Sequence, residues 1–238
     1  MNKVYISICL LFVCLQMQAQ ILSKKDLKSY EGYFDFYYEE STDKIYLQVK
    51  NLNEDFLYVN ALASGVGSND IGLDRGQLGG TRLVHFKKAG NKLLLVQPNL
   101  KYRANTDNAL EQKSIAQAFA TSVLFGFNIL AEKDGVYTID FTSFLLEDTH
   151  GVSQRLKGKK EGSYSVDKSK SALALERTKA FINNVEFEAL LTFKGQPTGR
   201  NLRSVAPTAS LVSVTQHHSF VKLPDDNYKP RVFDTRSG

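Results

Sequence analysis

The chain has 238 residues, of which 42% are apolar and 23% charged, and it carries a formal charge of +5. This composition is that of an ordinary globular protein and excludes a disordered, collagen-like or low-complexity chain. The basic excess lies in residues 151–238, where 15 Lys and Arg face 8 Asp and Glu. Binding to nucleic acid needs stacking aromatics among the basic residues, and only Tyr164 lies near the densest run. A solvated loop, or a face that meets an acidic partner surface, is therefore favoured over nucleic acid.

The first twenty residues predict a secretory signal peptide over residues 1–19. Lys3 precedes an apolar run over residues 4–15, and Ala19 offers a small residue at the cleavage point. The run is too short to span a bilayer, so we expect no stable membrane insertion after cleavage. A buried N-terminal strand is the alternative. Both cysteines, Cys9 and Cys14, lie inside this segment, so the mature chain would have no disulfide, thiolate metal site or cysteine nucleophile.

Alternating apolar and polar residues predict β-strands through most of the chain. The pattern is clear in residues 44–49 and 136–141, and it is longest over 185–193, where Val185, Phe187 and Leu191 share one face. Strands with one apolar and one polar face favour an antiparallel sheet. Residues 42–43, Gly90 with Asn91, and Asp134 with Gly135 mark the tips of three hairpins.

One segment has helical spacing. Ile115, Phe119 and Val123 recur every four residues, and Asn108 with Glu111 resembles a capping box. We expect a helix over about 108–125 that packs its apolar stripe on a sheet. The predicted fold is therefore mainly β (α+β), an antiparallel sheet or sandwich of hairpins with one packed α-helix. No linker divides the chain, so we expect one β-rich domain over 20–223 and an extended segment over 224–238.

The adjacent histidines His217 and His218 do not predict a metal site. Adjacent residues of a strand point to opposite faces, and zinc needs three or four ligands. We expect one of the two side chains to be packed and the other solvated. No His-Glu-x-x-His and no Gly-x-Ser-x-Gly motif occurs, so no catalytic, cofactor-binding or metal-binding residue is predicted in this chain.

A glycine-rich stretch over residues 64–80 follows a predicted strand. It contains Asp70, Asp74 and Arg75, but it matches neither the dinucleotide nor the phosphate-loop pattern. We expect Asp74 and Arg75 to form a local ion pair. A long structured loop in a compact domain is often functional, so an interaction role and a purely structural turn both remain open.

The stretches "YEGYFDFYYEESTDKIYLQV", "FLYVNALASGVGSNDIGLDRGQLG", "LVQPNLKYRANTDN" and "QHHSFVKLPDDNYKPRVFDTRSG" together resemble one family. They are similar to the N-terminal region, a domain of unknown function, of exported bacterial zinc-dependent metalloproteases. The resemblance covers residues 29–238. It implies that a metzincin-like catalytic domain with the zinc site follows this region, so that 20–223 is an accessory domain and 224–238 a connector.

The resemblance implies a non-catalytic accessory or prodomain-like region that packs on, or restrains, a catalytic domain of the same parent chain. No cofactor is expected in this chain, and zinc is expected in the catalytic domain. The protein would be exported to the periplasm, the outer surface or the medium. The candidate interdomain contacts are Asp70, Asp74, Arg75, His217 and His218. The alternatives are an independent periplasmic or surface module that binds peptide or glycan and, less favoured, a hydrolase; whether the chain is an enzyme is left open.

Overall fold

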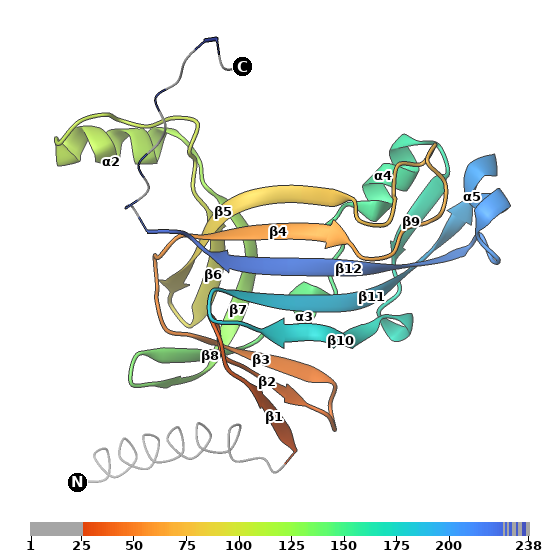
Figure 1. Cartoon of the computed structure of the whole chain (residues 1–238), viewed down its shortest axis with the longest axis horizontal. Coiled ribbons are helices and arrows are strands. Elements are labelled where there is room, and N and C mark those ends of the chain that lie inside the picture. The colour runs from red at the N-terminus through yellow and green to blue at the C-terminus, as the bar shows by residue number, and fades with distance from the viewer. Residues whose placement is uncertain (1–25, 226, 228, 230–231, 233–234, 237–238) are drawn as a thin grey trace, which may run out of the picture.

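The computed structural model describes residues 26–225, 227, 229, 232 and 235–236 (Figure 1). The predicted signal peptide and most of the predicted connector lie outside the described residues. The strands are β1 (Leu27–Tyr30), β2 (Phe36–Glu39), β3 (Lys44–Val49), β4 (Phe56–Leu62), β5 (Leu78–Ala89), β6 (Lys92–Gln97), β7 (Ser122–Lys133), β8 (Val136–Asp140), β9 (Gly162–Val166), β10 (Ala172–Ala180), β11 (Asn184–Pro197) and β12 (Leu211–Lys222). The α-helices are α2 (Ala109–Ala118), α3 (Thr142–Leu145), α4 (Val152–Gly158) and α5 (Arg200–Val205).

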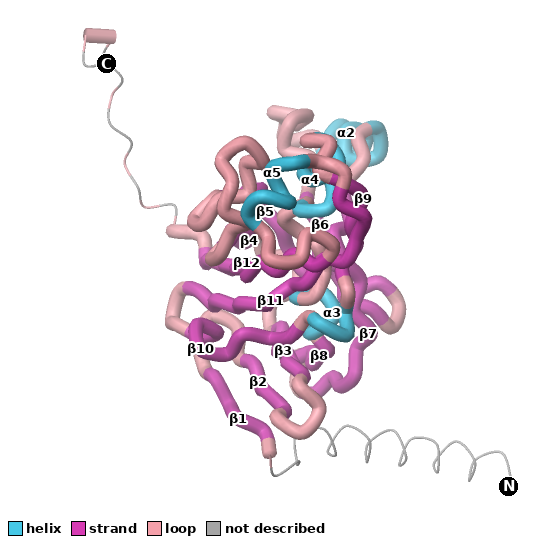
Figure 2. Tube along the Cα trace, turned by 90° about the vertical axis from the view of Figure 1, so that its right-hand side faces the viewer, coloured by secondary structure: helices cyan, strands magenta, loops and turns pink. Residues whose placement is uncertain are grey.

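The described strands form one antiparallel sheet, as the alternating pattern predicts. Its order is β1-β2-β3-β8-β7-β6-β5-β4-β12-β11-β10, and β9 pairs with β11 off this path. The sheet curls, as Figures 1 and 2 show, so that its two ends approach each other. The backbone N–H of Tyr33, beside β2, donates to the carbonyl of Phe181, beside β10, at 2.7 Å.

The predicted apolar face of residues 185–193 is confirmed, but the opposite face, expected to be wet, is partly buried, since Glu188 and Thr192 are also buried. Val185, Phe187, Ala189, Leu191 and Phe193 of β11 are all fully buried. The three predicted hairpin tips are also present. At the tip between β7 and β8, Asp134 and Gly135 have φ of 51° and 78°, as the tight hairpin turn requires.

Two hydrophobic clusters fill the interior. The first lies inside the curled sheet and is rich in phenylalanine, with Phe36, Phe56, Phe86, Phe127, Phe141, Phe144, Phe187 and Phe220 all buried. The second lies near α4 and α5 and contains Leu62, Ile71, Leu73, Val152, Leu156, Tyr164, Ala189, Leu191, Phe193, Leu202, Val212 and Val214. Because β4, β11 and β12 supply residues to both clusters, these three strands join the two halves of the core.

The predicted helix over 108–125 is wrong in length and in packing. α2 ends at Ala118, and residues from Ser122 onward belong to β7. Asn108 does cap the helix, since its side chain accepts from the N–H of Leu110 at 3.0 Å. However, α2 buries none of its residues, and Val123 is 55% exposed. The apparent stripe combined residues of a short helix with residues of the next strand.

We predict that Phe187→Ala lowers the free energy of unfolding by about 3–5 kcal/mol, the usual loss for a large aromatic residue removed from a packed core. Phe187 is fully buried and its ring contacts those of Phe36, Phe141 and Phe220. Phe181→Ala is the control, because that side chain is 48% exposed. Urea unfolding gives both values, and a loss below about 1 kcal/mol for Phe187→Ala would contradict this packing.

Candidate functional site

The histidine pair on β12 places one imidazole on each face of the sheet, as predicted. His218 is fully buried, whereas the His217 side chain is 27% exposed. His218 lies opposite Phe187 of β11 and Asn60 of β4, and His217 lies opposite Glu188 and Ala61. The two side chains therefore belong to different environments and cannot share a ligand.

His218 belongs to a buried polar layer between the two hydrophobic clusters. Its Nδ1 lies 2.9 Å from the hydroxyl of Tyr58, and its Nε2 lies 3.1 Å from Nε2 of Gln216. The amide nitrogen of Gln216 also donates to the carbonyl of Glu147, and a side-chain amide nitrogen can only donate. His218 Nε2 is therefore the acceptor, and Nδ1 carries the proton of a neutral imidazole.

The polar layer holds the chain between α3 and α4 against the sheet. The N–H of His150 donates to Oε1 of Gln216 at 2.9 Å, and the Asn60 amide donates to the Thr149 hydroxyl at 3.4 Å. Asn60 Oδ1 and His150 Nδ1 are buried without a hydrogen-bond partner in the described part of the chain. The contacts to the 147–150 backbone position α4, which begins immediately afterwards.

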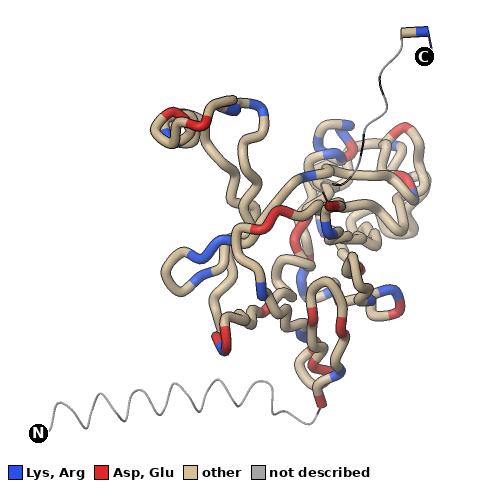
Figure 3. Tube along the Cα trace, turned by 60° about the vertical axis from the view of Figure 1, so that its left-hand side comes forward, with Lys and Arg blue, Asp and Glu red and all other residues tan. Residues whose placement is uncertain are grey.

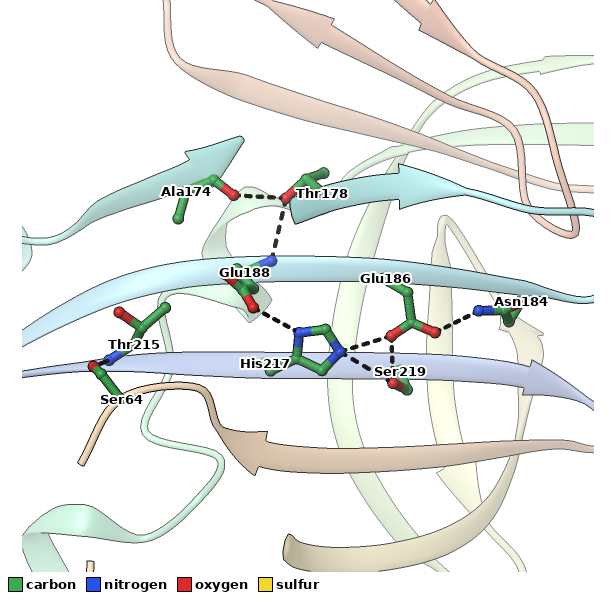
Figure 4. Close-up of polar contacts among 9 residues, drawn as sticks. All are labelled: Ser64, Ala174, Thr178, Asn184, Glu186, Glu188, Thr215, His217 and Ser219. Carbon is green, nitrogen blue, oxygen red and sulfur yellow. Dashed lines mark hydrogen bonds and ion pairs between the residues drawn. The ribbon is translucent and has the colours of Figure 1, made fainter. Parts of the chain in front are cut away.

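His217 lies between two carboxylates on the other face of the sheet (Figure 4). Its Nδ1 is 3.0 Å from Glu188 Oε1, and its Nε2 is 2.8 Å from Glu186 Oε2. Glu186 also accepts from the Ser219 hydroxyl and, at 2.6 Å, from the Asn184 amide. Because Glu186 and Glu188 alternate along β11, both point to the face that His217 occupies.

This cluster superficially resembles a Ser-His-Glu triad, since Ser219 Oγ lies 3.3 Å from His217 Nε2. In an active triad the imidazole accepts the serine proton at Nε2. Here that nitrogen is hydrogen-bonded to the carboxylate of Glu186, and the Ser219 hydroxyl donates to the same carboxylate. The arrangement favours a charged His217 imidazolium that bridges two carboxylates. This bridge joins β11 to β12, and it is not the arrangement that activates a nucleophile.

The pKa values of the two histidines move in opposite directions. The hydrogen bond to Glu186 raises the pKa of His217 above its usual 6.5, although burial opposes the change. Burial would raise the pKa of Glu186, but the hydrogen bonds from His217, Ser219 and Asn184 outweigh it and lower this pKa. Burial lowers the pKa of His218 to about 3.

The glycine-rich stretch is mainly a structural turn. Ile71 and Leu73 are buried in the second cluster, and the hydroxyl of Ser64 accepts from the N–H of Thr215 at 2.7 Å. Asp70 and Arg75 are exposed, and Asp74 is half-buried. The expected ion pair between Asp74 and Arg75 is wrong, because these neighbours form no salt bridge; the backbone turns at Gly76, with φ of 81°, and pairs with Leu62.

The five candidate contact residues do not form one surface. The loop with Asp70, Asp74 and Arg75 follows the end of β4 and lies beside Thr215. The chain beyond Lys222 leaves from the other end of β12 (Figure 1), about 23 Å away at the usual rise of an extended strand. His218 is fully enclosed, so among the five only the loop residues and His217 are accessible to a partner.

Sequence reasoning missed the carboxylates around His217. The signal was present as two glutamates that alternate with apolar residues in "VEFEALLTF". Their partner could not be identified, because the register that brings Glu188 opposite His217 joins residues 29 positions apart. The described residues contain no group of three or more His, Cys, Asp or Glu that could hold a metal ion. No helix in the same part of the chain is long and apolar enough to span a membrane.

We predict that NMR titration will show His217 titrating above pH 6.5, while His218 stays neutral far below it. The pKa of His217 is raised in the folded state. The stabilisation from its ion pairs with Glu186 and Glu188 is therefore fully present below pH 6.5 and is lost as the pH rises through the folded-state pKa. The pKa of Glu186 is lowered, so its contribution is lost only as the pH falls below 4.5 through the folded value.

Acidification changes the contribution of His218 to stability in the opposite direction to that of His217. Below pH 6.5 the imidazole of His218 is protonated in the unfolded chain, whereas in the folded chain it stays neutral down to about pH 3. Acidification therefore lowers the free energy of unfolding. His217→Asn should abolish the loss of stability that wild type shows on the alkaline side of pH 6.5. If the imidazoles of His217 and His218 both titrated near pH 6.5, this assignment would be refuted.

Comparisons with known proteins yield family models but no close relative of known function. No curated protein and no solved structure matches the chain. Residues 18–65 match the model of a domain of unknown function, DUF5118, and residues 76–238 match that of a second, DUF5117. The strands of the two stretches pair within one sheet, since β4 lies between β5 and β12. Because its model matches more than half of the residues, the chain belongs to the family described as domain of unknown function (DUF5117).

Proposed function

We propose that the chain is a non-catalytic accessory region that packs on, and positions or restrains, the catalytic domain of an exported zinc-dependent metallopeptidase. One structural observation supports a large partner: the segment between β6 and β7, residues 98–121, projects from the sheet (Figure 1). We call this segment the arm. None of its residues is buried.

The arm is ordered mainly by contacts within itself. Tyr102 stacks on Phe119 with ring centroids 3.9 Å apart, and Asn99 donates to the carbonyl of Ala120 at 3.2 Å. Gln112 of α2 donates to the carbonyl of Thr106 at 2.8 Å. A ten-residue helix is marginal by itself in water, and helices in proteins gain most of their stability from packing. The arm is therefore suited to gain stability from a partner surface.

The arm presents apolar side chains to solvent. Leu110 is 76% exposed, and Leu100 and Tyr102 are 45% and 44% exposed. Tyr102 also lines a cavity of about 320 Å³, which Leu100 and Leu110 do not line; the other lining residues are Pro98, Asn99, Arg103, Ala104, Gln112, Ile115, Ala116, Phe119 and Thr121. Exposed apolar side chains on a projecting segment are typical of protein-interaction surfaces.

The identity of the partner comes from the family resemblance. A metallopeptidase catalytic domain would carry the zinc and the catalytic residues, and this chain would supply only a surface. Export follows from the predicted signal peptide. The same hollow also favours the alternative function, an independent module that binds a peptide. The glycine-rich stretch over residues 64–80 is less favoured as the binding surface of such a module, because it packs Ile71 and Leu73 into the core.

We predict that Leu110→Asp weakens binding of this chain to the separately expressed catalytic domain at least about tenfold, the loss expected of an interface hot spot. The substitution should change the unfolding free energy of the chain by less than about 0.5 kcal/mol, since the side chain is largely in water. Ile182→Asp is the matched control, because Ile182 is 87% exposed at the hairpin between β10 and β11.

The coding sequence beyond codon 238 decides which domain to express. An in-frame domain with His-Glu-x-x-His supports the proposal, and its absence would refute it. If that domain is present but binds wild type and Leu110→Asp equally, the arm is not the docking element. If the domain does not bind while a peptide does so with the same dependence on Leu110, the independent binding module is the correct function.

A further inference from the structure

Helix α4 lies far along the sheet from the arm (Figure 1), and a second cavity lies beside this helix. It has a volume of about 410 Å³ and is lined by His150, Gly151, Gln154, Arg155, Gly158 and Lys159. No part of the proposed function uses it.

The helical repeat of α4 explains the lining. Val152 and Leu156 are one turn apart and fully buried in the second cluster. Arg155 and Lys159 are also one turn apart, and both line the cavity with Gly158 between them. A Cβ on Gly158 would meet nothing within 4 Å, so the backbone there borders open space. The apolar side of the helix faces the core, and a charged side faces the hollow.

The cations of this cavity are not neutralised within the described residues. Neither Arg155 nor Lys159 forms a salt bridge there, although basic and acidic residues are interspersed over much of the chain (Figure 3). The nearby Asp148 instead accepts from the N–H groups of Val152 and Ser153, at 2.7 and 2.9 Å. Glu161 is buried and accepts from the N–H of Leu202 at 3.0 Å.

His150 adds polarity to the cavity without adding charge. Its burial lowers the pKa below the usual 6.5, so the imidazole is neutral at physiological pH. The glycine-rich loop borders the same helix, since a Cβ on Gly72 would lie 4.0 Å from Nη1 of Arg155. Asp70 and Asp74 of that loop form no salt bridge with either cation among the described residues. The charged side chains that line the hollow are therefore Arg155 and Lys159, and the carboxylate of Asp148 acts on the hollow from one side, since it opposes the lowering of the pKa of His150.

We propose that this cavity binds carboxylate side chains of an acidic polypeptide segment, with Arg155 and Lys159 as the charge partners. The planar guanidinium of Arg155 can receive a carboxylate through two parallel N–H donors, and Lys159 adds a point charge one turn away. Nucleic acid is disfavoured, because no aromatic residue lines the cavity and Tyr164, the aromatic nearest to Lys159 in the sequence, is buried and donates its hydroxyl to the carbonyl of Ala209. A membrane is disfavoured, because the apolar residues of α4 face the core.

Isothermal titration of the full chain with a capped hexaglutamate peptide tests this inference, with hexaglutamine as the uncharged control. We expect binding of hexaglutamate alone, weakened at least tenfold by Arg155→Gln with Lys159→Gln. The matched control is Lys157→Gln with Lys160→Gln, which removes the same charge from exposed residues that do not line the cavity. This control should change the affinity less than threefold.

Each other outcome overturns the inference. Equal losses in the two double variants would mean diffuse attraction to a basic surface. Binding of inorganic phosphate with the same dependence on Arg155, without binding of hexaglutamate, would assign a small-anion site. Binding to anionic phospholipid vesicles but not to the peptide would assign a lipid surface. If none of the probes bound, the cavity would not be an anion-binding site.

Discussion

The pairing of β11 with β12 is the constraint on which the rest of the structure depends. The two strands match continuously from Asn184 opposite Val221 to Lys194 opposite Leu211. Val185 and Phe187 belong to the first hydrophobic cluster, whereas Ala189, Leu191 and Phe193 of the same strand belong to the second. A one-residue slip would move every one of these side chains to the opposite face. One register therefore fixes both halves of the core at once.

The adjacent histidines illustrate how this register assigns chemistry. On the inner face, His218 is held neutral between Tyr58 and Gln216, in a polar layer that positions the chain leading into α4. On the outer face, His217 is favoured as a cation between Glu186 and Glu188. Adjacent residues of identical type thus acquire opposite charge preferences, because the strand gives them different surroundings. The inner layer in turn positions the helix that lines the basic cavity.

Much of the sheet could be predicted from local pattern, since alternation in Val185–Phe193 and the Asp134-Gly135 turn depends on neighbouring residues only. The helix over 108–125 could not, because Ile115, Phe119 and Val123 satisfy a helical period across the boundary between α2 and β7. The partners of His217 depend on pairing between strands distant in the sequence. The cavity at α4 depends on which side of a short helix the core covers. The proposed function was even less accessible, because a surface for a partner, unlike a catalytic site, has no fixed sequence motif.

Because β4, β11 and β12 contribute to both clusters, the two clusters should form a single cooperative unit, on which the arm and the basic cavity are supported. Native-state amide hydrogen exchange tests this directly along β11, in the half around Val185 and Phe187 and the half around Leu191 and Phe193. One unit predicts that the slowest amides of both halves open with the same free energy, equal to that of global unfolding. A difference of more than about 2 kcal/mol between the halves would mean that the clusters unfold separately, which would contradict the account.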